Sequence, residues 1–282
     1  MAAEIISGKD LAHELRLEMK QKVSELNDRG IYPKLSVILV GDNPASKSYV
    51  NGKKKACKET GILSDVIEMD SDTTEAQLLQ QIELLNEDPS VHGILVQLPL
   101  PKQIREQKVI DTISFEKDVD GFHPINIGRM MTGEDAFLPC TPFGIITMLK
   151  SKNIPIAGKH AVVVGRSNIV GKPVGQLLLN EHATVTYCHS RTSNLQQLTQ
   201  QADILIAAVG KINAIRAEHI KEGAVVIDVG INRLEDGSLT GDVDFEAAKE
   251  KASYITPVPR GVGPMTITML LENTIKAAKG LA

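Results

Sequence analysis

The sequence has few aromatic residues and no tryptophan. Phenylalanine, tyrosine and tryptophan make up 3% of its 282 residues. Surfaces that bind single-stranded nucleic acid stack the bases on aromatic side chains, so this composition argues against such a surface. The formal net charge is −4, and a chain without a positive excess lacks the field that attracts nucleic acid or anionic membranes. We therefore predict neither a nucleic-acid partner nor a membrane partner.

Cysteine is also scarce. The chain has three cysteines, Cys57, Cys140 and Cys188, an odd number at wide spacing. This pattern gives neither a disulfide framework nor a zinc site, and it is typical of small buried side chains in a reducing compartment. The seven histidines form no metal-binding pattern, so we expect no metal.

Long apolar segments are absent as well. No apolar run approaches the roughly 20 residues that a membrane helix needs. The first residues lack the basic segment and apolar stretch of a secretory signal, so we expect a cytoplasmic protein. Hydrophobic residues make up 42% and charged residues 23%, which is ordinary for a globular chain long enough for two domains.

Apolar segments of strand length alternate with amphipathic helical segments in both halves of the chain. Strands separated by helices of about ten or more residues imply parallel sheets and an α/β fold. One helix is expected to begin near Ser46 and end at Gly61, and 234–238 has the chemistry of a hairpin turn. The loop-rich stretch 117–142 predicts a domain junction. The predicted strands are 35–40, 62–69, 91–98, 160–164, 183–188, 204–209 and 224–229.

A buried strand, His160–Val164, runs directly into a glycine-rich loop, Gly165–Gly175. Strand, glycine turn and helix start are the parts of a dinucleotide-binding unit, although a simple tight turn would read the same way. NAD-selective sites carry an acid after the next strand, but here the sequence is His189-Ser190-Arg191-Thr192. Hydroxyls and an arginine suit a 2′-phosphate, so NADP is favoured over a plain solvated loop.

A second group of residues could carry acid–base chemistry. Tyr49 and Lys53 are four residues apart, so they share one helix face. Neighbouring lysines and burial would both lower the pKa of Lys53 toward that of a general base. The alternative without a function is a lysine-rich helix face that is simply exposed to solvent. Gln97 is the polar residue near the end of the apolar strand that starts at Gly93. It could bond a lysine amine or only local backbone. Asp120 precedes a glycine, which is also ordinary turn chemistry.

Six segments together resemble one known family. The chain resembles the bacterial bifunctional methylenetetrahydrofolate dehydrogenase/methenyltetrahydrofolate cyclohydrolases, and the resemblance covers essentially its whole length. The six segments are Tyr49–Lys53, Gly93–Pro101, Lys117–Gly121, Pro139–Gly144, Val163–Gly171 and Thr256–Thr266.

The resemblance implies a fold and a pair of reactions. Residues 1–120 would form an αβα folate-binding catalytic domain, onto which a last helix, 265–282, packs back. Residues 121–264 would form a Rossmann-like NADP-binding domain, with a cleft between the two. NADP+ would oxidise 5,10-methylenetetrahydrofolate to the methenyl cation, and water would then open it to 10-formyltetrahydrofolate. A homodimer is also implied.

The resemblance also implies roles for the candidate catalytic residues. Lys53 would be the central acid/base group, and Gln97 would hydrogen-bond Lys53 and hold its neutral form. Tyr49 would pack on the folate, and Asp120 would bond the edge of the pterin ring.

The cofactor residues follow in the same way. Gly165, Arg166 and Ser167 would hold the cofactor phosphates, and Arg166, Ser190 and Arg191 would lie near the 2′-phosphate. Ile231 would contact the nicotinamide end. Substrate contacts are further implied for Pro259 and Gly261.

One position departs from the family pattern. The last loop of the family usually reads Pro-Gly-Gly-Val-Gly-Pro-Met-Thr, but here Arg260 stands in place of the first glycine. Arginine is strained there if the position needs a positive φ. If it does not, Arg260 adds a cation that could face the anionic folate.

Three alternatives compete with this reading. A dehydrogenase-only relative would have no strong need for Lys53 and Gln97. An amino-acid or shikimate-type dehydrogenase would share the fold but ignore folate. A regulator that binds NADP without chemistry fits poorly with an acidic chain that shows no DNA-binding helix pair.

Overall fold

The computed structural model of the protein describes residues 2–280. Residue 1, in the predicted first domain, and residues 281–282, at the end of the predicted last helix, lie outside the described residues. The chain divides into two compact units. Unit 1 contains the chain up to Ala12 and Thr141–Thr266, and unit 2 contains His13–Cys140 and the chain from Ile267 onward. The divisions lie at 140/141 and 266/267, where 120/121 and 264/265 were expected, and the segment up to Ala12, expected in the first domain, belongs to unit 1.

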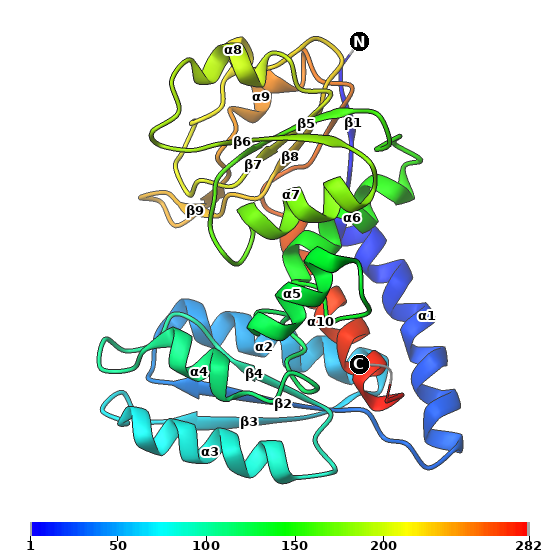
Figure 1. Cartoon of the computed structure of the whole chain (residues 1–282), viewed down its shortest axis with the longest axis vertical. Coiled ribbons are helices and arrows are strands. Elements are labelled where there is room, and N and C mark those ends of the chain that lie inside the picture. The colour runs from blue at the N-terminus through cyan, green and yellow to red at the C-terminus, as the bar shows by residue number, and fades with distance from the viewer. Residues whose placement is uncertain (1, 281–282) are drawn as a thin grey trace. The chain divides into compact units, whose positions relative to one another are not determined.

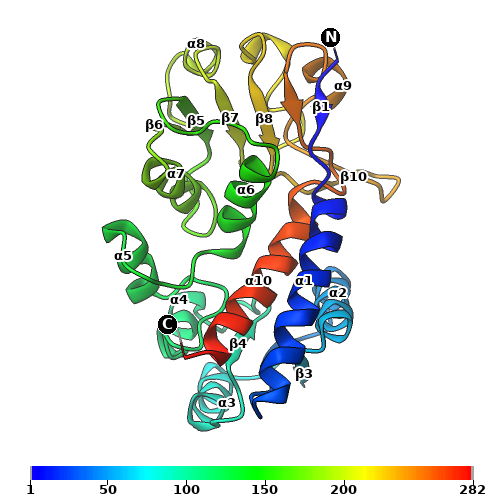
Figure 2. The ribbon, with the colours of Figure 1, turned by 90° about the vertical axis from the view of Figure 1, so that its right-hand side faces the viewer.

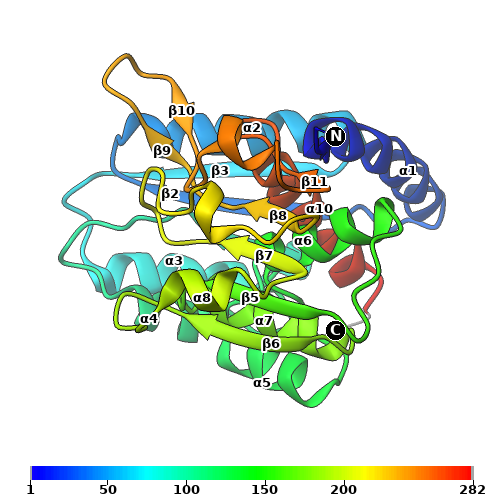
Figure 3. The same cartoon turned by 90° about the horizontal axis from the view of Figure 1, so that it is seen from above.

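Unit 1 is built on a six-stranded parallel sheet. Its neighbouring strands β8, β7 and β5 and the edge strand β6 can be followed in Figure 3. The strand order is β1-β11-β8-β7-β5-β6. Strands β1 and β11 have two residues each, too short for a sequence pattern, and neither is among the predicted strands. The six strands are β1 (Glu4–Ile5), β5 (His160–Val164), β6 (Thr184–Cys188), β7 (Ile204–Ala207), β8 (Val225–Asp228) and β11 (Tyr254–Ile255).

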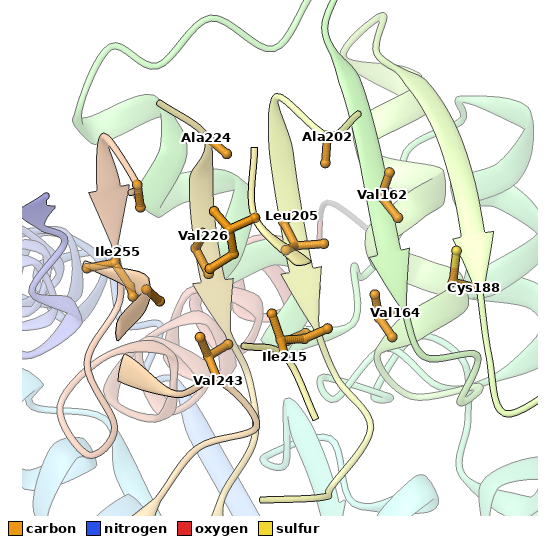
Figure 4. Close-up of a cluster of buried hydrophobic side chains, with 14 residues drawn as sticks. Val162, Val164, Cys188, Ala202, Leu205, Ile215, Ala224, Val226, Val243 and Ile255 are labelled. Atoms are coloured by element: carbon orange, nitrogen blue, oxygen red, sulfur yellow. The ribbon is translucent and has the colours of Figure 1, made fainter. Parts of the chain in front are cut away.

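The central strands of this sheet are almost entirely apolar, apart from His160 at the start of β5 and Asp228 at the end of β8, because both of their faces are covered. Val162, Leu205 and Val226 come from three of them and are fully buried in one cluster (Figure 4). A short antiparallel pair leaves this sheet at the predicted hairpin turn, which is confirmed. The remaining elements are α6 (Cys140–Ser151), α7 (Gly171–Asn180), α8 (Leu195–Thr199), η1 (Ala217–His219), β9 (Asn232–Arg233), β10 (Leu239–Thr240) and α9 (Phe245–Ala248).

Unit 2 is built on a three-stranded parallel sheet of order β3-β2-β4, with helices packed along it (Figure 1). Two long helices, α1 (Gly8–Asp28) and α10 (Val262–Ala278), run side by side (Figure 2), and Lys22 of one pairs with Glu272 of the other at 3.1 Å. The other elements are β2 (Lys34–Val40), α2 (Pro44–Thr60), β3 (Leu63–Met69), α3 (Glu75–Glu87), β4 (Gly93–Val96), α4 (Glu106–Thr112) and α5 (Pro124–Thr132).

The start of helix α2 differs from the prediction. Asn43, not Ser46, is its N-cap: the Asn43 Oδ1 accepts from the backbone N–H groups of Ala45 at 2.9 Å and Ser46 at 3.2 Å. Pro44 occupies the first helical position, which suits its fixed φ, so the helix begins earlier than expected. The predicted end is confirmed, since Gly61 closes the helix with φ 82°.

Between residues 2 and 280, no helix combines the length and the apolarity needed to cross a membrane.

Candidate active site

Lys53 and Gln97 meet at the carboxyl edge of the sheet in unit 2. Gln97 directly follows β4, and its backbone N–H donates to the Ile38 carbonyl of β2 at 2.9 Å. The Lys53 Nζ, from α2, donates to the Gln97 Oε1 at 2.8 Å, which confirms the predicted hydrogen bond. The Gln97 Nε2 donates to the Leu98 carbonyl at 2.7 Å, so the glutamine satisfies local backbone as well. Both ends of the amide are fixed, and its oxygen is held toward the amine.

Burial lowers the pKa of Lys53, and the nearby carboxylate of Asp120 partly opposes that effect. The prediction that the neighbouring lysines depress the pKa is wrong. Lys54, Lys55 and Lys58 are exposed, because successive helical residues turn away from the face that carries Lys53. Solvent screens their charges, so the pKa of Lys53 is lowered by desolvation and not by these lysines.

Two residues of the Lys117–Gly121 segment hold its ends in place. The Lys117 ammonium donates to three carbonyls at the end of α3, including that of Leu85 at 2.9 Å. Val119 fills the space above Gly93, where an added Cβ would lie 2.7 Å from the valine Cγ1. The segment is therefore anchored to α3 and β4.

Asp118 folds the chain that follows. Its buried carboxylate accepts from the backbone N–H of Phe122 at 3.3 Å, from that of His123 at 2.8 Å and from the Asn126 Nδ2 at 2.9 Å. Burial raises the pKa of Asp118 to about 7, and these donors oppose the rise. Gly121 has φ 77°, and an added Cβ would lie 2.5 Å from the Leu138 carbonyl carbon, so only glycine fits.

Asp120 is thereby brought to Lys53. Burial raises the pKa of the Asp120 carboxyl, while the Lys53 charge and a hydrogen bond from the Cys140 thiol lower it. The Cys140 backbone N–H also donates to the Asp120 carbonyl at 3.3 Å. An amine, an amide and a carboxylate thus lie together and can pass a proton or bind a heterocycle edge.

Tyr49 lies one helical turn before Lys53 on α2. Its side chain is 43% exposed, which leaves a ring available for stacking. Sequence reasoning gave Asp118, Asn126 and Cys140 no role. Cys140 was expected to be a buried apolar group, and its place in the Pro139–Gly144 segment was the one available signal.

The expected cofactor residues gather at the carboxyl edge of the sheet in unit 1. Val164 of β5 pairs with Cys188 of β6, so the loops that follow these strands leave the same edge. Gly165 has φ 139°, and an added Cβ would lie 2.2 Å from the Ala208 carbonyl oxygen. At Gly171 it would lie 2.6 Å from the Gly165 carbonyl carbon. This close backbone packing, ahead of the start of α7, fits a dinucleotide phosphate group.

The side chains around this turn are open to ligand. Arg166, Ser167, Ser190 and Arg191 are exposed, and Ile231, just after β8, is 47% exposed. The Ser167 Oγ accepts from the backbone N–H groups at the start of α7, each at 3.2 Å. These residues come from three strands of one sheet edge, and no acid stands at 189–192.

The loop between β11 and α10 carries the two remaining candidates. Pro259 is exposed, and Gly261 is buried where an added Cβ would lie 2.3 Å from the Pro257 carbonyl oxygen. Arg260 has φ 82°, so the strained alternative holds at this position. In the part of the chain that the structure describes, no group of three or more His, Cys, Asp or Glu side chains could hold a metal ion.

Comparison with known proteins gives a consistent result over the whole chain. The family model described as the tetrahydrofolate dehydrogenase/cyclohydrolase catalytic domain matches residues 6–120, and the model of the NAD(P)-binding domain of that family matches residues 139–282. The bifunctional protein FolD of Oceanobacillus iheyensis is 68% identical over 99% of this chain and 98% of its own.

Solved structures agree. A bifunctional FolD methylenetetrahydrofolate dehydrogenase/cyclohydrolase from Campylobacter jejuni has 52% identity and a TM-score of 0.98, covering 100% of both chains. The Trypanosoma brucei enzyme, solved with NADP and an inhibitor, has 38% identity and a TM-score of 0.95, covering 99% of this chain and 98% of its own. The predicted α/β fold and bifunctional activity are confirmed, and the shikimate-type and regulator alternatives fall away. The chain belongs to the tetrahydrofolate dehydrogenase/cyclohydrolase family.

Proposed function

We propose that unit 2 binds the tetrahydrofolate derivative and opens its methenyl form with Lys53 as the acid/base group. The observation that carries the proposal is the hydrogen bond of 2.8 Å between the Lys53 Nζ and the Gln97 Oε1. It holds an amine whose pKa is lowered by burial, and a partly neutral amine can accept a proton. The protein oxidises 5,10-methylenetetrahydrofolate and then hydrolyses the product to 10-formyltetrahydrofolate.

The hydrolytic step needs three proton movements. Water adds to the cationic methenyl carbon and loses a proton, which the neutral Lys53 amine accepts. The bond from that carbon to the N5 nitrogen then breaks, N5 gains a proton, and the hydroxyl loses one as the formyl group forms on N10. One proton is released overall. A single amine next to the carbon can accept the proton of the added water and pass it to N5. The proton that the hydroxyl loses is then the one released.

Gln97 suits this role because its amide oxygen is uncharged. A carboxylate at 2.8 Å would favour the ammonium form, whereas an amide oxygen accepts a hydrogen bond without adding charge. Gln97 therefore orients the amine and leaves its pKa low.

Asp120 and Tyr49 orient the substrate in this proposal. The Asp120 carboxylate would accept hydrogen bonds from the N–H groups of the pterin edge. The exposed ring of Tyr49 packs on the flat heterocycle from the same helix face as Lys53. Pro259 and Gly261 remain our candidates for further substrate contacts.

Unit 1 binds the cofactor, which we assign as NADP. Bound NADP+ supplies the hydride acceptor, and the chain binds and orients it. Gly165 and Ser167 would hold the phosphates, Arg166, Ser190 and Arg191 would hold the 2′-phosphate, and Ile231 would contact the nicotinamide. The relative solved with NADP and the missing acid at 189–192 support this choice.

We further propose that the protein is a cytoplasmic homodimer. Strand β6 ends the order of the sheet in unit 1, and its Tyr187 side chain is 41% exposed. An open strand edge with apolar side chains favours pairing with a second copy. Light scattering would give twice the chain mass of 30.6 kDa for a dimer, and a monomer mass would refute it.

Substitution of Lys53 tests the catalytic proposal most directly. General acid–base help is worth about 10²–10⁴-fold, so Lys53→Ala should lose hydrolysis of methenyltetrahydrofolate by that factor. Dehydrogenase activity should fall less, since the cofactor takes the hydride. The measurement is loss of methenyl absorbance without cofactor, corrected for the spontaneous rate. Lys58→Ala, an exposed lysine of the same helix, is the matched control. A normal hydrolytic rate in Lys53→Ala would refute the assignment.

A further inference from the structure

A side-chain amide is buried in the middle of the apolar helix α10. Asn273 is 2% exposed, and Leu271 and Ile275 on either side of it are buried hydrophobic residues. A buried amide is unfavourable unless it is hydrogen-bonded. Its Nδ2 donates to the Val119 carbonyl at 2.8 Å and to the Leu138 carbonyl at 3.0 Å. Both bonds reach segments more than a hundred residues away in the sequence.

The two carbonyls belong to segments that flank Asp120, the carboxylate that we propose binds the folate. Val119 directly precedes Asp120, and Leu138 lies two residues before Cys140, which contacts Asp120 through its backbone N–H and its thiol. The Leu138 backbone also packs against Gly121, so the two segments touch on both flanks of Asp120. Asn273, from α10, links the two segments through its hydrogen bonds to the Val119 and Leu138 carbonyls.

The thiol of Cys140 has two acceptors and one proton. Its Sγ lies 3.2 Å from the Val119 carbonyl oxygen, and it also hydrogen-bonds the Asp120 carboxylate. Because the Asn273 Nδ2 already donates to the Val119 carbonyl, that oxygen has less need of the thiol proton. The Nδ2 also lies 3.7 Å from the Sγ, so the proton that it directs to the Val119 carbonyl can be shared with the sulfur, and the thiol proton is left for the carboxylate.

We propose that Asn273 is a positioning residue of the folate site: by satisfying the Val119 and Leu138 carbonyls it directs the Cys140 thiol to Asp120 and fixes that carboxylate for the pterin edge. The inference rests on the proposed role of Asp120. Asn273 touches neither substrate nor Lys53 in this scheme, and it acts through Cys140 and the backbone. Its loss should therefore change substrate binding more than the chemical step.

The test compares Asn273→Ser with Thr274→Val. Thr274 is buried on the same helix and its hydroxyl donates to the Leu270 carbonyl of that helix at 2.8 Å, so its substitution perturbs α10 without removing a hydrogen bond to the Asp120 loop. Asn273→Ser should raise the KM for methenyltetrahydrofolate roughly tenfold, with a smaller fall in kcat, and Thr274→Val should stay within about twofold. Equal effects of the two variants, or a normal KM in Asn273→Ser, would overturn the proposal.

A double-mutant cycle separates positioning from general loss of structure. If Asn273 acts through the thiol, Asn273→Ser should add little to the KM of a Cys140→Ala protein, whereas additive effects would count against the route through Cys140. If Asn273→Ser does not fold, variants of Cys140 test the proposal instead. Cys140→Ser keeps a hydroxyl donor and should recover most of the KM that Cys140→Ala loses, and a failure to recover it would overturn the proposal.

Asp120→Asn separates the proposed role of Asn273 from the proposed role of Asp120 on which it rests. An unchanged KM in Asp120→Asn would refute the proposed role of Asp120 itself. A raised KM in Asp120→Asn together with a normal KM in Asn273→Ser would refute only the role of Asn273.

Discussion

At the scale of single residues, the site depends on what each buried polar atom faces. The Gln97 amide gives its oxygen to Lys53 and its nitrogen to the backbone, so the acceptor next to the amine is uncharged. The pKa of Lys53 is then governed mainly by burial, which lowers it. An uncharged residue at position 97 therefore leaves the pKa of Lys53 low, and a charged one would change it.

Gln97→Glu should move that pH upward. A carboxylate beside the amine favours its charged form and should raise the pKa of Lys53 by about one to three units. The neutral fraction below the pKa falls tenfold per unit, so hydrolysis of methenyltetrahydrofolate at neutral pH should drop, and the midpoint of its pH profile should shift to higher pH. Gln97→Met, of similar size but uncharged, should lower the rate without raising the midpoint. An unshifted midpoint in Gln97→Glu would argue against Lys53 as the titrating group.

The sequence predicted the members of this site better than it predicted their support. Lys53, Gln97 and Asp120 stand in recognisable segments, and their chemistry suggested a partner for each. Asn273 donates to carbonyls 154 and 135 residues earlier in the chain, and nothing local to α10 indicates which backbone it meets. A lone asparagine among apolar helix residues does signal a buried bond, but only the fold supplies the acceptor.

At the scale of elements, the loop between β11 and α10 combines tight packing with a strained residue. Gly261 leaves no room for a side chain, and Arg260 before it has φ 82°. The Arg260 carbonyl accepts from the Lys9 N–H at 3.0 Å, so this conformation is held by the start of α1. A long side chain such as that of arginine is strained in this left-handed region, which glycine adopts freely.

Arg260→Gly should therefore stabilise the protein. Relief of left-handed strain gives about 1–2 kcal/mol, and the added freedom of glycine in the unfolded chain removes about 0.5–1 kcal/mol of that gain. The net gain of about 1 kcal/mol should raise Tm by about 2–4 °C. The folate KM should change only a few-fold, because the exposed arginine contributes little charge attraction.

The matched control is Asn153→Gly. Asn153 also has a positive φ, 51°, but asparagine tolerates this region, so its Tm should not rise. A lower Tm for Arg260→Gly would mean that the arginine side chain stabilises the loop, and a collapse of activity would give it a catalytic importance that we do not assign.

Element boundaries followed the sequence at the end of α2 and departed from it at the start of α2 and at the shortest strands. Gly61 ended α2 as predicted, whereas Asn43 took the cap expected of Ser46 because Pro44 pre-sets the first helical turn. Strands β1 and β11 are held by pairing partners in the sheet rather than by any pattern of their own two residues.

At the scale of the whole molecule, two units are assembled from interleaved parts of the chain. The sequence suggested a junction within 117–142, and the resemblance implied a last helix that packs back onto the first domain. In the structure the chain from Ile267 onward belongs with His13–Cys140, and the segment up to Ala12 belongs with Thr141–Thr266. Nothing in the sequence indicates that the segment up to Ala12 belongs with the cofactor unit. The units nevertheless carry distinguishable chemistry in our proposal: proton transfer in one and cofactor binding in the other.

Substitutions at the cofactor edge should therefore separate the two activities. A charge-assisted hydrogen bond is worth about 1.5–3 kcal/mol, so Arg166→Ala or Ser190→Ala should raise the KM for NADP+ by roughly one order of magnitude or more. The KM for NAD+ should rise less, because NAD+ has no 2′-phosphate to lose. Lys221→Ala removes an exposed cation just before β8, at the opposite edge of the same sheet, and should leave both values nearly unchanged.

The hydrolytic activity of the same variants completes the argument. Opening of methenyltetrahydrofolate uses no cofactor, so Arg166→Ala should hydrolyse it within about twofold of the normal rate when NADP+ is absent, while Lys53→Ala should fail at any cofactor concentration. Oxidation measured with both cofactors and hydrolysis measured with neither would give the full comparison. Equal kcat/KM for NADP+ and NAD+ in the unaltered protein would refute the 2′-phosphate assignment. A parallel loss of hydrolysis in Arg166→Ala would refute the division of chemistry between the units, because a residue that only binds cofactor has no part in a reaction that does not use it.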